Sequence, residues 1–295
     1  MEVLVSSHPR PSLLLGLASL LRPRQWIKSA FVLAPLIFSG AIVSIDAIER
    51  SFVAMIFFCV AASAVYVLND IIDMRDDKRH PDKVVTRPLA AGAVTVFHAL
   101  VLLFLLYGTL ALAWVLAPDI VFVLALYVVL NVAYALVLKH QPVIDIFTIA
   151  IGFVLRVYAG AMAIGVQVSQ WMFVTTLCLA LYLAATKRRQ ELSQVGVAGR
   201  AVLQRYTVAL TERFAEMSST GAILFYSLYV MSSKPQLVVT IPIVLFGLYR
   251  YAYAVEALGK GQSPTDVLWT DRQLALGIVV WVVTCVWLLW PSGGG

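Results

Sequence analysis

Long apolar stretches alternate with short polar ones along almost the whole chain. An apolar stretch of about 20 residues is long enough to cross the hydrocarbon core of a bilayer as a helix. Turn-forming pairs, such as Pro118 with Asp119 and Gln141 with Pro142, stand between the stretches. The pattern predicts an all-α, polytopic membrane protein with nine spanning helices. We expect these helices at residues 27–44, 51–71, 96–116, 120–138, 143–163, 171–185, 207–231, 238–257 and 274–290.

Residues 1–21 are expected to form a tail that precedes the first spanning helix. The apolar segment 13–21 is too short to cross a bilayer, so it is a candidate for a helix that lies in the membrane interface. Trp26, which follows it closely, suits the headgroup level. At the other end, residues 291–295 are expected to form a short C-terminal tail, which leaves 22–290 as the transmembrane domain.

The composition agrees with a membrane protein. Hydrophobic residues make up 61% of the chain and charged residues 13%, and the mean hydropathy is +0.89. A soluble globular domain has a lower apolar share and about 25% charged residues. The three cysteines lie inside apolar runs without metal-ligand spacing, so we interpret them as buried hydrophobic residues.

The basic residues are distributed unevenly among the loops. If the N-terminus is placed inside, all 22 Lys and Arg residues except Arg50, Arg156 and Lys234 belong to inside segments or to the adjoining helix ends. Such an excess marks the cytoplasmic side. We therefore expect a cytoplasmic N-terminus and, with nine spans, a C-terminus outside the plasma (inner) membrane. The net charge of +6 then comes from basic loops that set the orientation and can contact anionic lipid or phosphate. We expect no nucleic-acid partner.

An acidic motif ends the second expected span. Asp70, Asp73 and Asp77 are spaced at i, i+3 and i+7, which places them on one stripe of a helix, and Asn69 precedes them. Mg²⁺ is usually held by one or two carboxylates together with substrate phosphates. The motif therefore predicts a site for Mg²⁺ and a diphosphate at the cytoplasmic end of this helix, with Asp76 as an alternative to Asp77. The competing interpretation is an ordinary solvated loop after a membrane helix.

Basic side chains occupy several other inside segments. Lys and Arg form charge-assisted hydrogen bonds with phosphate oxygens, so these residues are candidates for binding phosphate groups away from the metal. Lys187 and Glu191 are at i and i+4 in the weaker order for a helical ion pair, which favours an external partner for Lys187. The candidates are Lys28, Lys83, Arg87, Lys139, Lys187 and Arg188, with Tyr134 near the end of the fourth span.

One arginine is expected within the membrane. Asp145 and Arg156 in the fifth span are 11 residues apart, close to three helical turns, so they share a face. A charge at the centre of the bilayer is costly. Two roles are open for Arg156: binding substrate, or extending toward the outer interface.

The pattern Asn69-Asp70-x-x-Asp73-x-x-x-Asp77, within nine spans, resembles the UbiA superfamily of intramembrane prenyltransferases. The resemblance runs from Arg22 to about Trp290. It implies a helical bundle around a central cavity that is open to lipid and cytoplasm, with a diphosphate bound through Mg²⁺ at the acidic motif. Typical aromatic prenyltransferases of the family carry a second acidic motif after the sixth span. This chain has the basic sequence KRRQE at 187–191 instead.

The basic sequence at 187–191 resembles that of one branch of the family, the decaprenyl-phosphate phosphoribosyltransferases. The sequences RPRQWIK at 22–28, HPDK at 80–83 and LKHQPVID at 138–145 resemble the same branch. Where Asn is expected after Lys28, this chain has Ser29. The resemblance implies transfer of 5-phosphoribose from phosphoribosyl diphosphate (PRPP) to decaprenyl or another polyprenyl phosphate, for arabinan precursors of the cell wall. It also implies Mg²⁺ as cofactor and a lipid bilayer as environment, and a homo-oligomer is possible.

The resemblance assigns roles to the candidate residues. The catalytic residues are expected to be Asp70, Asp73, Lys28 and Lys187, and the metal ligands Asp70, Asp73 and Asp77. The competing functions are an aromatic prenyltransferase with a polyprenyl diphosphate donor, and a transporter. The residues expected to bind substrate or phosphate are Asn69, Lys83, Arg87, Tyr134, Lys139, Arg188 and Arg156.

Overall fold

The computed structural model describes residues 12–79, 84, 86–195, 201–258 and 264–290. Every regular element within these ranges is a helix, which confirms the all-α expectation. The chain divides into two compact units. Unit 1 comprises Met1–Trp26 and Cys59–Leu112, and unit 2 comprises Ile27–Phe58 and Ala113–Gly295. Helix α3 (Ile45–Ile72) contributes its first half to unit 2 and its second half to unit 1.

Unit 1 packs short helices against the second half of α3. Helix α1 (Leu13–Leu21) begins at Ser12, whose hydroxyl accepts from the backbone N–H of Leu15. Helix α6 (Val96–Ala111) begins in the same way at Thr95. Helix α4 (Met74–Asp77) follows α3 after a bend at Asp73. The core of the unit consists of Leu20, Ala64, Val67, Leu89, Val94, Ala99 and Leu103.

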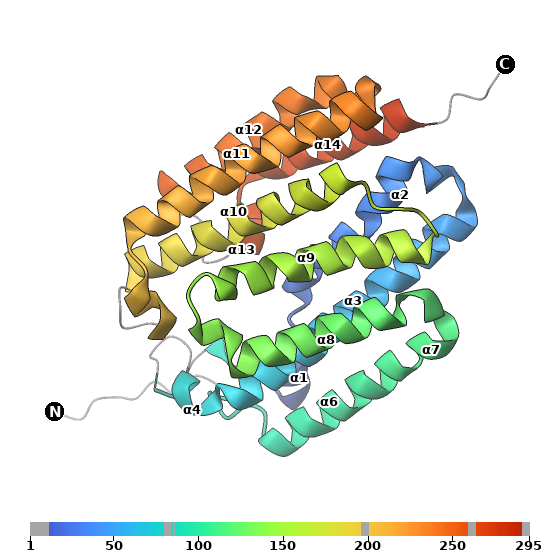
Figure 1. Ribbon diagram of the computed structural model, residues 1–295. Coiled ribbons are helices and arrows are strands. Elements are labelled where there is room, and N and C mark those ends of the chain that lie inside the picture. The colour runs from blue at the N-terminus through green and yellow to red at the C-terminus, as the bar shows by residue number, and fades with distance from the viewer. Residues whose placement is uncertain (1–11, 80–83, 85, 196–200, 259–263, 291–295) are drawn as a thin grey trace. The chain divides into compact units, whose positions relative to one another are not determined.

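Five long helices of unit 2 and the short helix α2 form a closed ring of contacts. Along the ring, α9 contacts α10, α10 contacts α11, α11 contacts α12, α12 contacts α14, α14 contacts α2, and α2 contacts α9 (Figure 1). Residues of α2, α10, α11, α12 and α14 line an apolar cavity of about 130 Å³, among them Phe38, Tyr229 and Trp281. The helices are α2 (Ala34–Ser39), α9 (Ile144–Ala163), α10 (Gln170–Val195), α11 (Val208–Ser233), α12 (Ile241–Glu256) and α14 (Arg272–Leu289).

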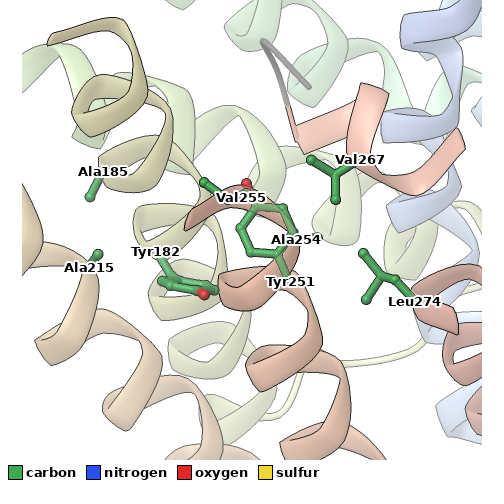
Figure 2. Packing of buried hydrophobic residues seen from close by; sticks show 8 residues of the cluster. All are labelled: Tyr182, Ala185, Ala215, Tyr251, Ala254, Val255, Val267 and Leu274. Atoms are coloured by element: carbon green, nitrogen blue, oxygen red, sulfur yellow. The ribbon is translucent and has the colours of Figure 1, made fainter. Parts of the chain in front are cut away.

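Short elements complete unit 2. The 3-10 helix η4 contacts α8 and α9, and it also contacts η6, which precedes α11. Near α13, Tyr182 and Tyr251 meet edge to face at 5.6 Å in a core that Val267 and Leu274 complete (Figure 2). These elements are η1 (Pro23–Leu33), which begins in unit 1, η2 (Ala41–Val43), α7 (Ala113–Leu116), η3 (Pro118–Ile120), α8 (Val121–Leu136), η4 (Leu138–His140), η6 (Ala201–Arg205), η7 (Pro235–Thr240) and α13 (Pro264–Thr270).

Among the described residues, six helical segments are long and apolar enough to cross a membrane. They correspond to the second, third, fourth, fifth, eighth and ninth expected spans. The long helices α10 and α11, of 26 residues each, occupy the sixth and seventh positions but carry more polar sequence. The six segments are Ile45–Ile72, Val96–Leu116, Pro118–Leu136, Ile144–Ala163, Pro235–Glu256 and Arg272–Leu289.

The expectation of one continuous helix at 27–44 is wrong. The structure has three short pieces there, η1, α2 and η2. Pro35 lies in the first turn of α2 and cannot donate a backbone hydrogen bond to an earlier turn. Gly40, at φ +80, ends α2 in the left-handed conformation that favours glycine.

One glycine permits a close approach. An added Cβ on Gly160 of α9 would lie 1.8 Å from the carbonyl oxygen of Val32, so the two backbones meet where only glycine fits. Gly165 differs: the residue has φ +67 in a turn, and no atom lies within 4 Å of an added Cβ.

Candidate active site

The acidic motif keeps its helical register across the end of α3. The backbone N–H of Asp73 donates to the carbonyl of Asn69 at 2.9 Å, and that of Asp77 donates to the carbonyl of Asp73 at 2.9 Å. The side chains of Asp70 and Asp77 are 2% and 4% exposed, Asp73 is half-buried and Asp76 is exposed. Asp73 and Asp77 are close enough to Asp70 for their negative charges to repel it. The motif therefore forms the expected stripe, with Asp77 rather than Asp76 on its buried side.

Two arginines pair with the same oxygen of Asp70. Nη1 of Arg87 donates to Oδ1 of Asp70 at 2.6 Å, and Nη2 of Arg22 donates to that oxygen as well. Arg87 was a candidate from the sequence, whereas Arg22 was missed as a site residue. The available signal was its place in a segment expected on the same side of the membrane as the acids. Lys83 lies outside the described residues.

The acidic stripe fits a metal ion whose coordination is completed by substrate. Within the described ranges, no three His, Cys, Asp or Glu side chains are grouped so that they could hold a metal by themselves. Mg²⁺ requires only one or two carboxylates when phosphate oxygens supply the other ligands. Asp70 and one of its acidic neighbours meet that requirement.

Arg188 is the centre of a buried polar cluster in unit 2. Its side chain is 1% exposed. Nε donates to Oδ2 of Asp145 at 2.6 Å, Nη1 to Oε2 of Glu191 at 2.5 Å, and Nη2 to the hydroxyl of Tyr134 at 3.0 Å. Burial lowers the pKa of Arg188, but Glu191, Tyr134 and Asp145 outweigh it and raise the pKa above its usual value. The guanidinium therefore stays positively charged, and it forms its hydrogen bonds with groups of the protein.

Tyr206 extends this cluster to a strained backbone. Its hydroxyl donates to Oδ1 of Asp145 at 2.6 Å and accepts from the backbone N–H of Val143 at 2.6 Å. Val143 has φ +70 and ψ −47, which is unfavourable for a β-branched residue. Burial and the bond to Asp145 raise the pKa of Tyr206, so it stays protonated. Tyr206 was not predicted as a site residue, because nothing in its neighbourhood along the chain resembles a binding motif.

The lysine candidates of unit 2 have different environments. Nζ of Lys187 is 3.9 Å from Oε1 of Glu191, and the Lys187 side chain is 31% exposed. Lys139 in η4 is 8% exposed, and Lys28 in η1 is half-buried. Because η4 contacts η6 and α9, Lys139 lies at the same end of unit 2 as the Arg188 cluster. By unit, Asn69, Asp70, Asp73, Asp77 and Arg87 belong to unit 1, and Lys28, Tyr134, Lys139, Arg156, Lys187 and Arg188 belong to unit 2.

The Arg156 side chain points back along α9, away from the end of the helix that was expected to lie outside. Nη1 donates to the carbonyl of Gly152 at 2.8 Å and Nη2 to the hydroxyl of Tyr127 at 2.8 Å, so the side chain turns back toward the start of α9. The guanidinium carbon lies 4.7 Å from the centre of the Tyr127 ring, with the rings of Phe153 and Phe58 also close. Such cation–π contacts stabilise a desolvated guanidinium by about 2 kcal/mol.

Comparison with known proteins identifies the relatives of this chain. It is 34% identical over 293 residues to the decaprenyl-phosphate phosphoribosyltransferase of Mycobacterium tuberculosis, covering 95% of this chain and 96% of that protein. The protein of the same name in Corynebacterium glutamicum is 31% identical over 298 residues, covering 95% of this chain and 88% of that protein.

The fold also has solved counterparts. The structure of a UbiA homolog from Archaeoglobus fulgidus, bound to GPP and Mg²⁺, matches with a TM-score of 0.73 at 15% sequence identity. The match covers 93% of this chain and 99% of that one. The model of the UbiA prenyltransferase family matches residues 30–265. This chain therefore belongs to the UbiA prenyltransferase family.

Proposed function

We propose that this protein transfers 5-phosphoribose from PRPP to decaprenyl phosphate or a related polyprenyl phosphate, and releases diphosphate. The observation that carries the proposal is the likeness over about 95% of the chain to decaprenyl-phosphate phosphoribosyltransferases. The end of α10 supports it, because the buried Arg188 cluster lies where an aromatic prenyltransferase would have a second acidic motif. The product would serve as a lipid precursor of cell-wall arabinan.

The acidic stripe is assigned to the diphosphate of PRPP. Asp70 and Asp73, with Asp77, would hold Mg²⁺, which neutralises the charge that develops on the leaving diphosphate. Asn69 and Lys83 would bind diphosphate oxygens, and Arg87, already close to Asp70, would do the same. Asn69, Lys83 and Arg87 would stabilise negative charge on the diphosphate without gaining or losing a proton.

The cations of unit 2 are assigned to the other phosphate groups of the reactants. Lys28, Lys139 and Lys187 would bind the 5-phosphate of PRPP and the phosphate of the lipid. Arg188 was expected to bind phosphate directly, but its donors are engaged by Asp145, Glu191 and Tyr134. We assign to it the positioning of Tyr134 and of the end of α10. Arg156 remains a candidate for binding substrate within the membrane.

The attacking group needs no general base. A lipid phosphate is ionised at neutral pH, so its oxygen can attack C1 of the ribose directly as the bond to diphosphate breaks. Attack from the face opposite the leaving group inverts the configuration at C1. Catalysis then consists of positioning the reactants and stabilising charge.

The membrane topology belongs to the same proposal. We propose nine crossings around a central cavity open to lipid and cytoplasm, in the plasma (inner) membrane, with a cytoplasmic N-terminus and an external C-terminus. The excess of Lys and Arg on one set of loops supports this orientation. Cysteines introduced into the loops and labelled from one side of sealed vesicles would test it.

The decisive test is a reaction with purified protein. Incubation with PRPP, Mg²⁺ and decaprenyl phosphate is expected to yield a lipid heavier by one phosphoribosyl group, measured by mass spectrometry. The alternative is an aromatic prenyltransferase that uses a polyprenyl diphosphate donor. Protection from thermal unfolding by a prenyl diphosphate with Mg²⁺, together with no protection by PRPP and no phosphoribosyl lipid, would favour that alternative.

A further inference from the structure

Arg22 has a backbone conformation that its side chain does not favour. It follows the last residue of α1 with φ 50 and ψ 59, in the left-handed region. Glycine is the usual residue at this position of a helix, because any Cβ is unfavourable there. An arginine at a position that favours glycine indicates that contacts of its side chain offset the unfavourable backbone conformation.

Three contacts fix the segment that carries Arg22. The hydroxyl of Ser63 on α3 donates to the carbonyl of Leu21 at 2.9 Å and accepts from Nε1 of Trp26 at 3.0 Å. The guanidinium carbon of Arg22 lies 4.8 Å from the centre of the Tyr66 ring. Ser63, Tyr66 and Asp70 follow one another at i, i+3 and i+7, so one face of α3 holds the segment and directs Arg22 toward Asp70.

Arg22 and Arg87 approach one oxygen of one carboxylate, and we call them the guanidinium pair. Asp70 is 2% exposed, whereas Arg22 is 23% and Arg87 is 26% exposed. Oδ1 of Asp70 is thus covered by two cations that themselves remain within reach of solvent. A divalent ion cannot bind that oxygen while both guanidinium groups stay on it, because all three are positively charged and compete for the same lone pairs.

We propose that Arg22 is a diphosphate-binding residue and that the guanidinium pair occupies the metal-binding oxygen of Asp70 until a metal–diphosphate complex arrives. Asp70 then exchanges the pair for the metal ion, and the two guanidinium groups move onto diphosphate oxygens, for which their planar donor sets are suited. This inference rests on the proposed function for the identity of the donor. The exchange itself requires only a divalent ion and a diphosphate group.

The exchange predicts opposite effects of one substitution on two binding reactions. In Arg22→Ala, Mn²⁺ alone should bind about tenfold more tightly, because a competing cation is removed from Asp70. Inorganic diphosphate with Mn²⁺ should bind about tenfold more weakly, because a charge-assisted hydrogen bond is lost. Both affinities are measured without turnover, by electron paramagnetic resonance of Mn²⁺ and by calorimetry on purified protein in lipid nanodiscs.

Arg24→Ala is the matched control. Arg24 is exposed, lies on the same segment and has the same charge, so its removal should leave both affinities within twofold. Arg22→Lys keeps the positive charge but loses the planar donor set, and it should show the same two effects in smaller degree. It also provides the measurement if Arg22→Ala fails to fold. Unchanged or weaker Mn²⁺ binding in the Arg22 variants would overturn the exchange, and unchanged diphosphate binding would overturn the role of Arg22.

Failure of the proposed function gives a different result. If the donor is a prenyl diphosphate instead of PRPP, the opposite effects with Mn²⁺ and inorganic diphosphate remain, while PRPP fails to compete with diphosphate. If the donor is PRPP but the exchange is absent, PRPP competes and the opposite effects do not appear. The two ideas can therefore fail separately.

Discussion

Arg188 and Asp145 form an ion pair in which the two side chains are only 1% and 0% exposed, with Nε of Arg188 2.6 Å from Oδ2 of Asp145. The second oxygen of Asp145 accepts from Tyr206, and the remaining donors of Arg188 reach Glu191 and Tyr134. Each charge is thus surrounded by hydrogen-bond partners. Removing one member leaves the other charge buried without compensation, which is far more costly than losing an exposed pair.

Asp145→Asn is therefore expected to destabilise the protein by about 3–5 kcal/mol. Unfolding in denaturant, followed by circular dichroism in detergent, measures the change. Asp46→Asn is the matched control, because Asp46 pairs with Arg50 at an exposed site where the side chains are 71% and 55% exposed. That substitution should change the free energy of unfolding by less than about 1 kcal/mol. Equal effects in the two variants would contradict a special role for the buried pair.

Val143→Gly should stabilise the protein by about 1 kcal/mol, because glycine adopts φ +70 without the steric cost that valine has there. Little packing is lost, since the Val143 side chain is 40% exposed. Val143→Ala removes the same methyl groups but keeps the Cβ, so no stabilisation is expected. The same unfolding measurement distinguishes them. A gain in the alanine variant would show that the methyl groups, and not the backbone, carry the strain.

Gly160→Ala should destabilise the protein by about 1–3 kcal/mol or prevent folding, because the added methyl would meet the carbonyl of Val32 at 1.8 Å. Gly108→Ala on α6 provides the comparison, since no atom lies within 4 Å of its added Cβ. Alanine in place of glycine within a helix usually adds about 0.5–1 kcal/mol. Melting temperatures of the purified variants should therefore move in opposite directions.

Asp73→Asn should fold normally and lose turnover about 10²-fold or more, since a half-buried ligand on the acidic stripe is removed while its size is kept. Incorporation of labelled phosphoribose into lipid measures the rate. Wild-type turnover in this variant would exclude a metal role for Asp73.

A paired experiment separates Asp77 from Asp76. Asp77 is buried and its charge acts on Asp70, whereas Asp76 is exposed. Asp77→Asn should therefore lower turnover much more than Asp76→Asn. The reverse order would move the third metal ligand to Asp76.

The sequence predicted the parts of this protein that depend on local pattern. Six spans follow from length and apolar composition alone, and the stripe of Asp70, Asp73 and Asp77 follows from helical spacing. The first span was predicted as one helix because its apolar run is long enough. The helix is interrupted at Pro35 and Gly40, and a count of apolar residues does not take the effects of these two residues into account.

Side-chain partners were harder to predict, because they join residues that are distant along the chain. Arg188 meets an aspartate 43 positions earlier, and Arg22 one 48 positions later. A count of charges assigns both arginines to segments expected to be cytoplasmic, but it cannot tell a phosphate ligand from an internal counter-ion. Tyr206 gave no signal at all, since its role comes only from the backbone of Val143 and the carboxylate of Asp145.

The length of α10 has a consequence for how a water-soluble reactant reaches this enzyme. The helix continues to Val195, ten residues beyond the apolar stretch that was expected to end at Ala185, which adds about 15 Å at 1.5 Å per residue. Lys187 lies two residues beyond the expected end of that apolar stretch, on the part of α10 that also carries the buried Arg188. A charged sugar phosphate that binds Lys187 would therefore meet α10 beyond its apolar part, and would not have to enter hydrocarbon.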